Sequence, residues 1–173
     1  MHDHWLRQQL EAHHRESFGW AMACCGRDPQ RAEDVLQRTY LKVLEGKARY
    51  DAGAKFKTWL FAVIRNTARD EKRRELLRHI GLMRYEAHAG AIRNADGDSA
   101  GESLDRSHVR AVFVEALAKL PARQRETMQL VFYHDMSLSE AAGVMGVSLG
   151  SARTHYDRGK QALRTLLRSR GIE

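Results

Sequence analysis

Hydrophobic residues recur along the first half of the chain at the spacing of amphipathic helices. One stripe consists of Val35, Leu36, Thr39, Tyr40 and Val43, and a second of Trp59, Leu60, Val63, Ile64 and Thr67. Each stripe predicts a helix with one buried face. Asp28 followed by Pro29 suits the N-cap and first turn of the first of these helices. We expect an earlier helix over Asp3–Cys25 and a turn near Gly53, which interrupts the pattern.

The second half shows the same periodicity with clearer helix boundaries. One amphipathic stripe consists of Val109, Val112, Phe113, Ala116, Leu117 and Leu120. Pro121 ends that helix and can open the next. Ser137 and Glu140 have the spacing of a capping box, so another helix should begin there. Gly146 then interrupts the pattern, and Ser148 can cap a final helix that reaches Leu167.

No stretch alternates between polar and apolar residues, so the expected fold class is all-α. Residues 88–107 are rich in Gly, Ala, Ser and Asp and have almost no large apolar side chains. Such a segment cannot offset its ordering entropy by burial, which favours a flexible linker over an ordered loop. We therefore expect two small helical domains, over 1–85 and 109–173, joined by a flexible linker over 86–108.

Charge and composition limit the classes of function that this chain can have. The 173 residues carry a net charge of +7, with basic ends around a slightly acidic middle, a balance common in nucleic-acid binders. The absence of a long apolar run or a signal peptide favours a cytoplasmic protein. Histidines and the adjacent Cys24 and Cys25 crowd the N-terminus, but their spacing fits no zinc motif. We expect no metal, no cofactor and no small-molecule substrate.

The last two predicted helices have the pattern of a helix-turn-helix. Ala142 and Gly146 are small residues four positions apart, which permits a close approach and a tight turn. On the final helix, the inner face would hold Ala152, Tyr156, Gly159, Leu163 and Leu166, and the outer face Ser151, Arg153, Thr154, Asp157, Arg158 and Lys160. Arginine can contact guanine in the major groove while hydroxyls and lysine hold phosphates. A helical hairpin with a solvated basic face is the alternative.

Cations and aromatic residues are interleaved over residues 55–74. With Trp59, Val63 and Ile64 buried, the outer face would hold Asn66, Arg69 and Arg73. This arrangement suits single-stranded or melted DNA, with cations along the phosphates and Phe56 and Phe61 near unstacked bases. Taken alone, a core aromatic beside a solvated basic face is the commoner meaning of such a stretch.

The order of these segments resembles one known family. Residues 32–44 (AEDVLQRTYLKVL) and 56–74 (FKTWLFAVIRNTARDEKRR) resemble region two of the extracytoplasmic-function (ECF) sigma factors of bacterial RNA polymerase. Residues 118–125 (AKLPARQR), 137–142 (SLSEAA) and 146–153 (GVSLGSAR) resemble region four. The resemblance covers nearly the whole chain apart from the linker and the first 20 or so residues, and it implies a factor that directs core polymerase to specific promoters.

The resemblance also implies contact residues. Those for the polymerase clamp helices are Glu33, Asp34, Gln37, Leu41 and Lys42. Those for the minus-ten element are Lys55, Phe56, Lys57, Trp59, Arg65, Asn66 and Arg69, with a loop over 50–57 that accepts a flipped base. The alternative role for Trp59 is that of a buried core residue. Those for the minus-thirty-five element are Ser151, Arg153, Thr154, Asp157, Arg158 and Lys160. His155 and Asp157 depart from the common family pattern, so the promoter sequence cannot be transferred.

Family membership would bring three partners: core RNA polymerase, promoter DNA and an anti-sigma factor. Such a regulator is often membrane-bound and would hold the protein at the inner membrane. A stand-alone helix-turn-helix regulator remains an alternative, but it leaves residues 32–44 and 56–74 unexplained. An enzyme such as a metal-dependent nuclease is disfavoured, because the sequence shows no nucleophile elbow, phosphate loop or clustered carboxylates.

Overall fold

The computed structural model describes residues 2–86 and 106–169, and over these ranges the chain forms eight helices and no strand. The expected all-α class is confirmed. The chain divides into two compact units, residues 1–98 and 99–173. Most of the predicted linker falls on residues 87–105, outside the described residues.

The N-terminal unit contains the helices α1 (His2–Ala12), α2 (His14–Cys24), α3 (Pro29–Leu44) and α4 (Phe56–Glu86). The single helix expected over residues 3–25 is therefore two helices. The chain turns at His13, where the backbone leaves the helical region (φ −100°, ψ 5°). Asp28 caps α3 as expected, because its side chain accepts a hydrogen bond from the Arg31 N–H at 3.1 Å.

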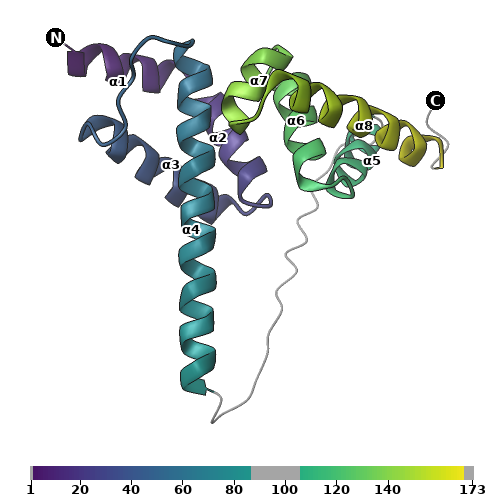
Figure 1. The fold of residues 1–173 in the computed structure, drawn as a ribbon, viewed down its shortest axis with the longest axis horizontal. Helices are drawn as coiled ribbons and strands as arrows, with labels where there is room; N and C mark the ends of the chain where they lie inside the picture. Colours follow the sequence, from purple (N-terminus) through teal and green to yellow (C-terminus); the bar gives the residue numbers. More distant parts are fainter. Residues whose placement is uncertain (1, 87–105, 170–173) are drawn as a thin grey trace. The chain divides into compact units, whose positions relative to one another are not determined.

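The core of this unit lies where α2, α3 and α4 pack against one another. Trp20 of α2 is fully buried, and its ring stacks on Phe61 of α4 with centroids 5.8 Å apart. The Trp20 indole N–H also donates a 3.0 Å hydrogen bond to the Phe61 carbonyl oxygen. The far end of α4 extends well past the helices that pack on its first half (Figure 1), so Leu76 and Leu77 are exposed there.

The C-terminal unit contains α5 (Arg106–Ala118), α6 (Ala122–Phe132), α7 (Leu138–Met145) and α8 (Leu149–Arg168). The expected capping box is present: Ser137 accepts from the Glu140 N–H, and the Glu140 carboxylate accepts from the Ser137 N–H. Gly146 takes the left-handed conformation (φ 64°, ψ 40°) that glycine adopts without a Cβ clash. Ser148 caps α8 by accepting from the Ser151 N–H.

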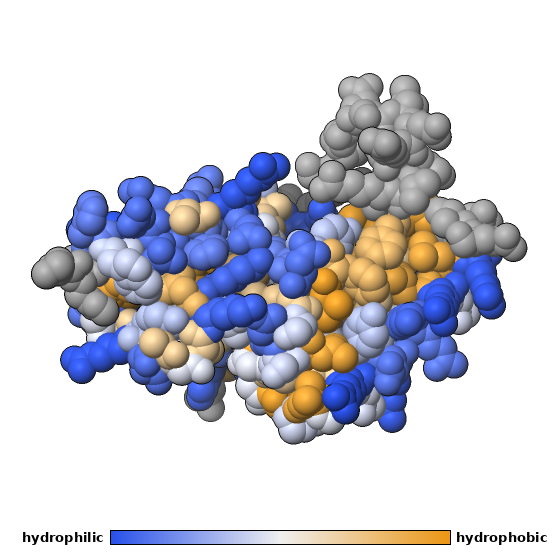
Figure 2. Space-filling model, turned by 90° about the horizontal axis from the view of Figure 1, so that it is seen from above, coloured by the Kyte–Doolittle hydropathy of each residue, from blue (hydrophilic) through white to orange (hydrophobic). Residues whose placement is uncertain are grey.

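Helix α8 packs against α5, α6 and α7 and so organises the core of this unit. That core holds Ala116, Leu117, Leu120, Met128 and Leu163. Large hydrophobic residues also reach the surface of the unit at Phe132, Tyr133 and Leu149. Figure 2 shows one face of the molecule, on which both hydrophobic and hydrophilic patches reach the surface.

At Gly159, α8 lies close against α6. A Cβ atom there would lie 3.0 Å from Met128 Cγ and 3.3 Å from Gln124 Cβ. We expect Gly159→Leu to destabilise this unit by about 1–3 kcal/mol, because the side chain would overpack the helix contact. In Gly159→Ala, a gain in helix propensity of about 1 kcal/mol should offset much of the smaller clash.

Urea unfolding followed by circular dichroism will measure this effect. All three tryptophans, Trp5, Trp20 and Trp59, lie in the N-terminal unit, so their fluorescence transition should not move in either Gly159 variant. If Gly159→Leu unfolds at the same urea concentration as the unaltered chain, the close approach of α6 and α8 is wrong.

Candidate polymerase-binding and DNA-binding surfaces

Helix α3 has one buried face and one polar outer face. The buried face holds Ala32, Val35, Leu36, Thr39 and Val43, which confirms the periodicity seen in the sequence. Four of the five residues assigned to polymerase contact, Glu33, Asp34, Gln37 and Leu41, lie exposed on the other side. Leu41 is 55% exposed although it is apolar. Single exposed apolar side chains are common on protein surfaces, so this exposure does not by itself mark an interface.

Lys42, the fifth assigned residue, points toward α4 and is half-buried. Its Nζ donates a 3.1 Å hydrogen bond to Thr67 Oγ1 and lies 3.6 Å from Asp70 Oδ2. The side chain is thus engaged within the protein, where α3 and α4 pack together. The other four residues assigned to polymerase contact are instead exposed on the outer face of α3.

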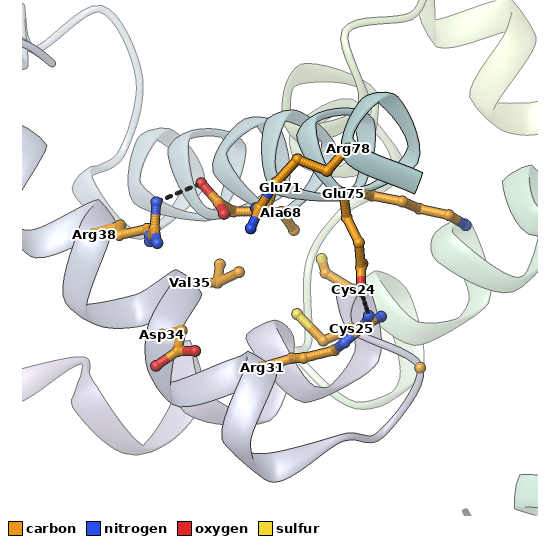
Figure 3. Close-up of a pocket in the computed structure, with 12 residues that line it drawn as sticks. Cys24, Cys25, Arg31, Asp34, Val35, Arg38, Ala68, Glu71, Glu75 and Arg78 are labelled. Atoms are coloured by element: carbon orange, nitrogen blue, oxygen red, sulfur yellow. Dashed lines mark hydrogen bonds and ion pairs between the residues drawn. The ribbon is translucent and has the colours of Figure 1, made fainter. Parts of the chain in front are cut away.

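Ion pairs between α3 and α4 continue along the same seam. Arg38 Nη1 lies 2.9 Å from Glu71 Oε1, and Arg31 pairs with Glu75; both contacts are drawn in Figure 3. Exposed ion pairs of this kind contribute at most about 1 kcal/mol each. They therefore add little to the apolar packing that holds α3 on α4.

An aromatic cluster supports the loop before α4. Tyr50 of the loop stacks on Trp5 of α1 at a centroid distance of 5.8 Å, and both rings contact Phe56 at 5.3–5.5 Å. Trp59 lies 5.3 Å from both Tyr50 and Phe56. The sequence did not reveal the part played by Trp5, because an isolated aromatic in a polar helix gives no sign of its partner.

Hydrogen bonds close the same loop on itself. The Tyr50 hydroxyl donates to the Ala54 carbonyl oxygen at 2.7 Å, and the Gly53 N–H donates to Asp51 Oδ1 at 3.0 Å. Residues 51–55 are exposed. Two internal hydrogen bonds and the aromatic cluster around Tyr50 therefore stabilise this exposed loop.

The residues assigned to the minus-ten element divide by exposure. Lys55, Asn66 and Arg69 are exposed, and Trp59 is half-buried. Phe56 and Arg65 are instead buried, with exposed fractions of 7% and 4%. Both side chains are largely covered by their own unit in this structure, and their assignment to the minus-ten element stays a prediction.

Phe61 and Lys57 also differ from the sequence-based expectation. Phe61 is fully buried against Trp20, so it offers no ring to an unstacked base. Lys57 is half-buried, with Nζ 2.7 Å from Glu16 Oε1 and 5.7 Å from the Phe61 ring centroid. Partial burial acts to raise the pKa of Glu16, but hydrogen bonds from Lys57 and His13 outweigh it and lower that pKa.

The N-terminal half of α8 exposes most of the residues assigned to the minus-thirty-five element. Ser151, Arg153, Thr154, Asp157 and Arg158 are exposed, whereas Ala152, Gly159 and Leu163 of the opposite face are buried. Ser151 Oγ also accepts a hydrogen bond from Ser148 Oγ. Lys160 is half-buried, with Nζ 5.8 Å from the Tyr156 ring centroid. The helix thus offers a polar, basic face at its capped end.

Within residues 2–86 and 106–169, no group of three or more His, Cys, Asp or Glu side chains is arranged to hold a metal ion. Nor does any helix there have the length and apolarity needed to cross a membrane.

Both units of this chain resemble known proteins. Residues 10–77 match the family model for sigma-70 region 2, and residues 110–163 match that for sigma-70 region 4. The RNA polymerase sigma factor CarQ of Myxococcus xanthus is 32% identical over 92% of this chain and 88% of its own length. The ECF sigma factor EcfG of Rhodopseudomonas palustris is 31% identical over 83% of this chain and 75% of its own.

Solved structures share the fold. The sigma factor RpoE of Bartonella quintana, solved with the anti-sigma factor NepR, superposes with a TM-score of 0.66 at 24% identity and covers 94% of this chain and 96% of its own. CnrH, solved with the cytosolic domain of CnrY, gives 0.63 at 22% identity, over 95% of this chain and 88% of its own. From the two family matches and the sequence identities, this chain belongs to the ECF sigma factors, which are transcription initiation factors.

Proposed function

We propose that this chain binds core RNA polymerase and directs it to promoters that carry two spaced elements. The observation that supports this best is the amphipathic character of α3 and α8. Both helices bury an apolar face in their own unit and expose the polar face whose residues the family uses for its partners. A stand-alone helix-turn-helix regulator would explain α7 and α8 but would leave the region 2 match unexplained.

The outer face of α3 is the proposed polymerase contact. It consists of Glu33, Asp34, Gln37 and Leu41, with Lys42 at its edge. Leu41 supplies the apolar contact, and the charged residues set orientation and selectivity. Because α3 and α4 pack against each other in the same unit, docking of α3 would also orient α4.

The minus-ten element is proposed to lie along the first half of α4 and the loop before it. Lys55, Asn66 and Arg69 would contact the phosphates and sugars of the melted strand. Lys57 would make the same kind of contact once its ion pair with Glu16 is broken. Trp59 and the exposed loop would receive the flipped base. Phe56 would support the loop through its ring contacts with Trp5 and Tyr50, and Phe56 and Arg65 would reach the DNA only if the packing around them opened.

The minus-thirty-five element is proposed to be read as duplex DNA by α8. Arg153, Thr154, Asp157 and Arg158 would face base edges in the major groove, and Ser151 and Lys160 would face phosphates. Asp157 can accept a hydrogen bond from cytosine N4. That choice would set this chain apart from relatives with a neutral residue at the position.

The domains follow from this assignment. Region two would span residues 1–85 and region four residues 109–173, with 86–108 as a flexible linker between them. The compact units at 1–98 and 99–173, and the family matches at 10–77 and 110–163, support this division. Neither domain would carry out a catalytic step; the catalysis belongs to the polymerase.

An anti-sigma factor is the proposed regulator. The similar structure of RpoE was solved with the anti-sigma factor NepR, and that of CnrH with the cytosolic domain of CnrY. A partner that covered the outer faces of α3 and α8 would block polymerase and promoter together. The chain would work in the cytoplasm and, if its regulator is membrane-bound, would be held at the inner membrane until release.

Transcription in vitro tests the proposal directly. Core RNA polymerase and sheared genomic DNA from the source organism would be incubated with and without the chain, and the 5′ ends of the transcripts mapped. We expect new start sites that share two spaced upstream elements. If no new starts arise while the chain alone binds duplex DNA specifically, the proposal fails and the stand-alone regulator takes its place.

Base recognition by α8 gives a sharper test. We expect Arg153→Ala to cost about 1–3 kcal/mol at one base position of the minus-thirty-five element, and to relax specificity there. Holoenzyme would be titrated onto promoters substituted one base pair at a time. Arg164→Ala is the matched control, because Arg164 is exposed on the same helix about 16 Å further along its axis.

The control should leave the ranking of promoter variants unchanged. Arg153→Ala should also leave the affinity for core polymerase unchanged. A uniform loss of affinity over all promoter variants would show that Arg153 contacts phosphate and does not read a base.

A further inference from the structure

A pocket of about 400 Å³ lies in the N-terminal unit where the end of α2 faces α3 and α4. The two cysteines of the chain, Cys24 and Cys25, line it from the end of α2. Val35 of α3 and Ala68 of α4 give it a small apolar wall, and most of its other lining residues are charged. The function proposed above makes no use of this pocket.

The two thiols share the pocket in a specific way. Both residues are half-buried and neither forms a disulfide. Figure 3 shows the two sulfur atoms on the same side of the chain, both directed into the space between α3 and α4. Both thiols therefore line one cavity, and their partial exposure leaves them accessible to solvent.

A direct bond between these sulfurs is disfavoured by their position. Cys24 is the last residue of α2 and Cys25 is its C-cap, and consecutive side chains on a helix diverge by about 100°. A disulfide needs Cβ atoms within about 4.5 Å and a specific dihedral angle, which adjacent residues reach only with backbone distortion. An atom placed between the sulfurs spans a wider separation and relaxes that constraint.

We propose that Cys24 and Cys25 form a dithiol site for an organic compound of trivalent arsenic, R–As=O. The two thiols condense with the arsenic centre, so that two As–S bonds form and the arsenic–oxygen double bond breaks. The two thiol protons leave with the oxygen as one molecule of water. Arsenic remains trivalent throughout, so the step needs no oxidant or reductant.

The surroundings of Cys25 disfavour reactions of its thiolate. Burial raises the pKa of Cys25; Arg31 opposes the shift and Asp28 adds to it. A protonated thiol is a poor nucleophile for alkylation or disulfide exchange. It is nevertheless a competent partner in a condensation that carries its proton away as water. Val35 and Ala68 offer an apolar surface to the organic group.

Phenylarsine oxide with the full chain is the direct test, read by intact-mass spectrometry. We expect one phenylarsenic group per chain, gained with the loss of two hydrogens. Excess monothiol should leave the adduct in place, and a small dithiol should remove it. Cys24→Ser and Cys25→Ser should each weaken binding by about 100-fold, because each removes the second, intramolecular bond. Circular dichroism would verify that both variants fold.

A pair of adjacent cysteines placed elsewhere in the chain tests whether tight binding needs the pocket or only two neighbouring thiols. In a chain carrying Cys24→Ser and Cys25→Ser, the additional changes Arg164→Cys and Thr165→Cys would place adjacent thiols at exposed positions of α8. We expect this pair to bind phenylarsine oxide about tenfold more weakly, because it lacks a preorganised cavity. Equal affinity at both locations, retention of the tight adduct by either single-serine variant, or no adduct on the unaltered chain would overturn the proposal.

Discussion

Replacing Trp20 with alanine is expected to destabilise the N-terminal unit by about 3–5 kcal/mol, the range for deleting a buried aromatic side chain. Trp20 is fully buried, stacks on Phe61 and donates to the Phe61 carbonyl oxygen. The loss is a large part of the stability of a small domain. The fluorescence of Trp5 and Trp59 would follow the unfolding of this unit in urea, since both remain in the variant.

Two comparisons make the result specific. Trp20→Phe keeps an aromatic ring in the core and loses the hydrogen bond, so its cost should be only about 1–3 kcal/mol. Trp5→Ala removes a ring that is 37% exposed and should cost less than Trp20→Ala. A loss below about 1 kcal/mol in Trp20→Ala would contradict the packing of α2 on α4.

Helix boundaries were predictable wherever the signal is local. Asp28, Ser137 and Ser148 cap their helices as expected, and Gly146 takes the positive φ that its position in the turn required. Each signal depends on a hydrogen bond within three residues or on the conformation of one residue. Neither depends on the rest of the fold.

Features set by tertiary contacts were not predictable in the same way. The turn at His13 has no proline or glycine to mark it. Gly159 gave no sign that it would lie against Met128, because a glycine in a helix has no side chain to indicate a partner. The burial of Phe61 follows from the packing of α2 and α3 against α4, which one stripe of hydrophobic residues cannot specify.

The candidate sites show the same division. The exposed face of α8 could be predicted, because it lies opposite a clear apolar stripe. Arg65 could not: an arginine within a basic helix is expected to be exposed, and only the packed structure shows it to be 4% exposed. Lys42 is a related case, since its position on α3 suggests an outer face while its Nζ contacts Thr67.

Replacing Leu41 with arginine is expected to weaken the affinity for core polymerase by roughly 30-fold, or about 2 kcal/mol, the threshold for an interface hot spot. Leu41 is the large apolar side chain on the outer face of α3 and is 55% exposed. An arginine there would carry its charge into the contact. The folded chain should lose at most about 0.5 kcal/mol, because the side chain is not packed in the core.

Leu77→Arg is the matched control, because it makes the same change at a leucine on α4 that is 58% exposed. Affinity would be measured by titrating labelled chain with core polymerase. Asp34→Arg, on the same face as Leu41, should also impair holoenzyme formation without unfolding the chain, whereas Leu77→Arg should not. If Leu41→Arg and Asp34→Arg both bind core polymerase as tightly as the control, the outer face of α3 is not the docking surface, and the exposure of Leu41 needs another explanation.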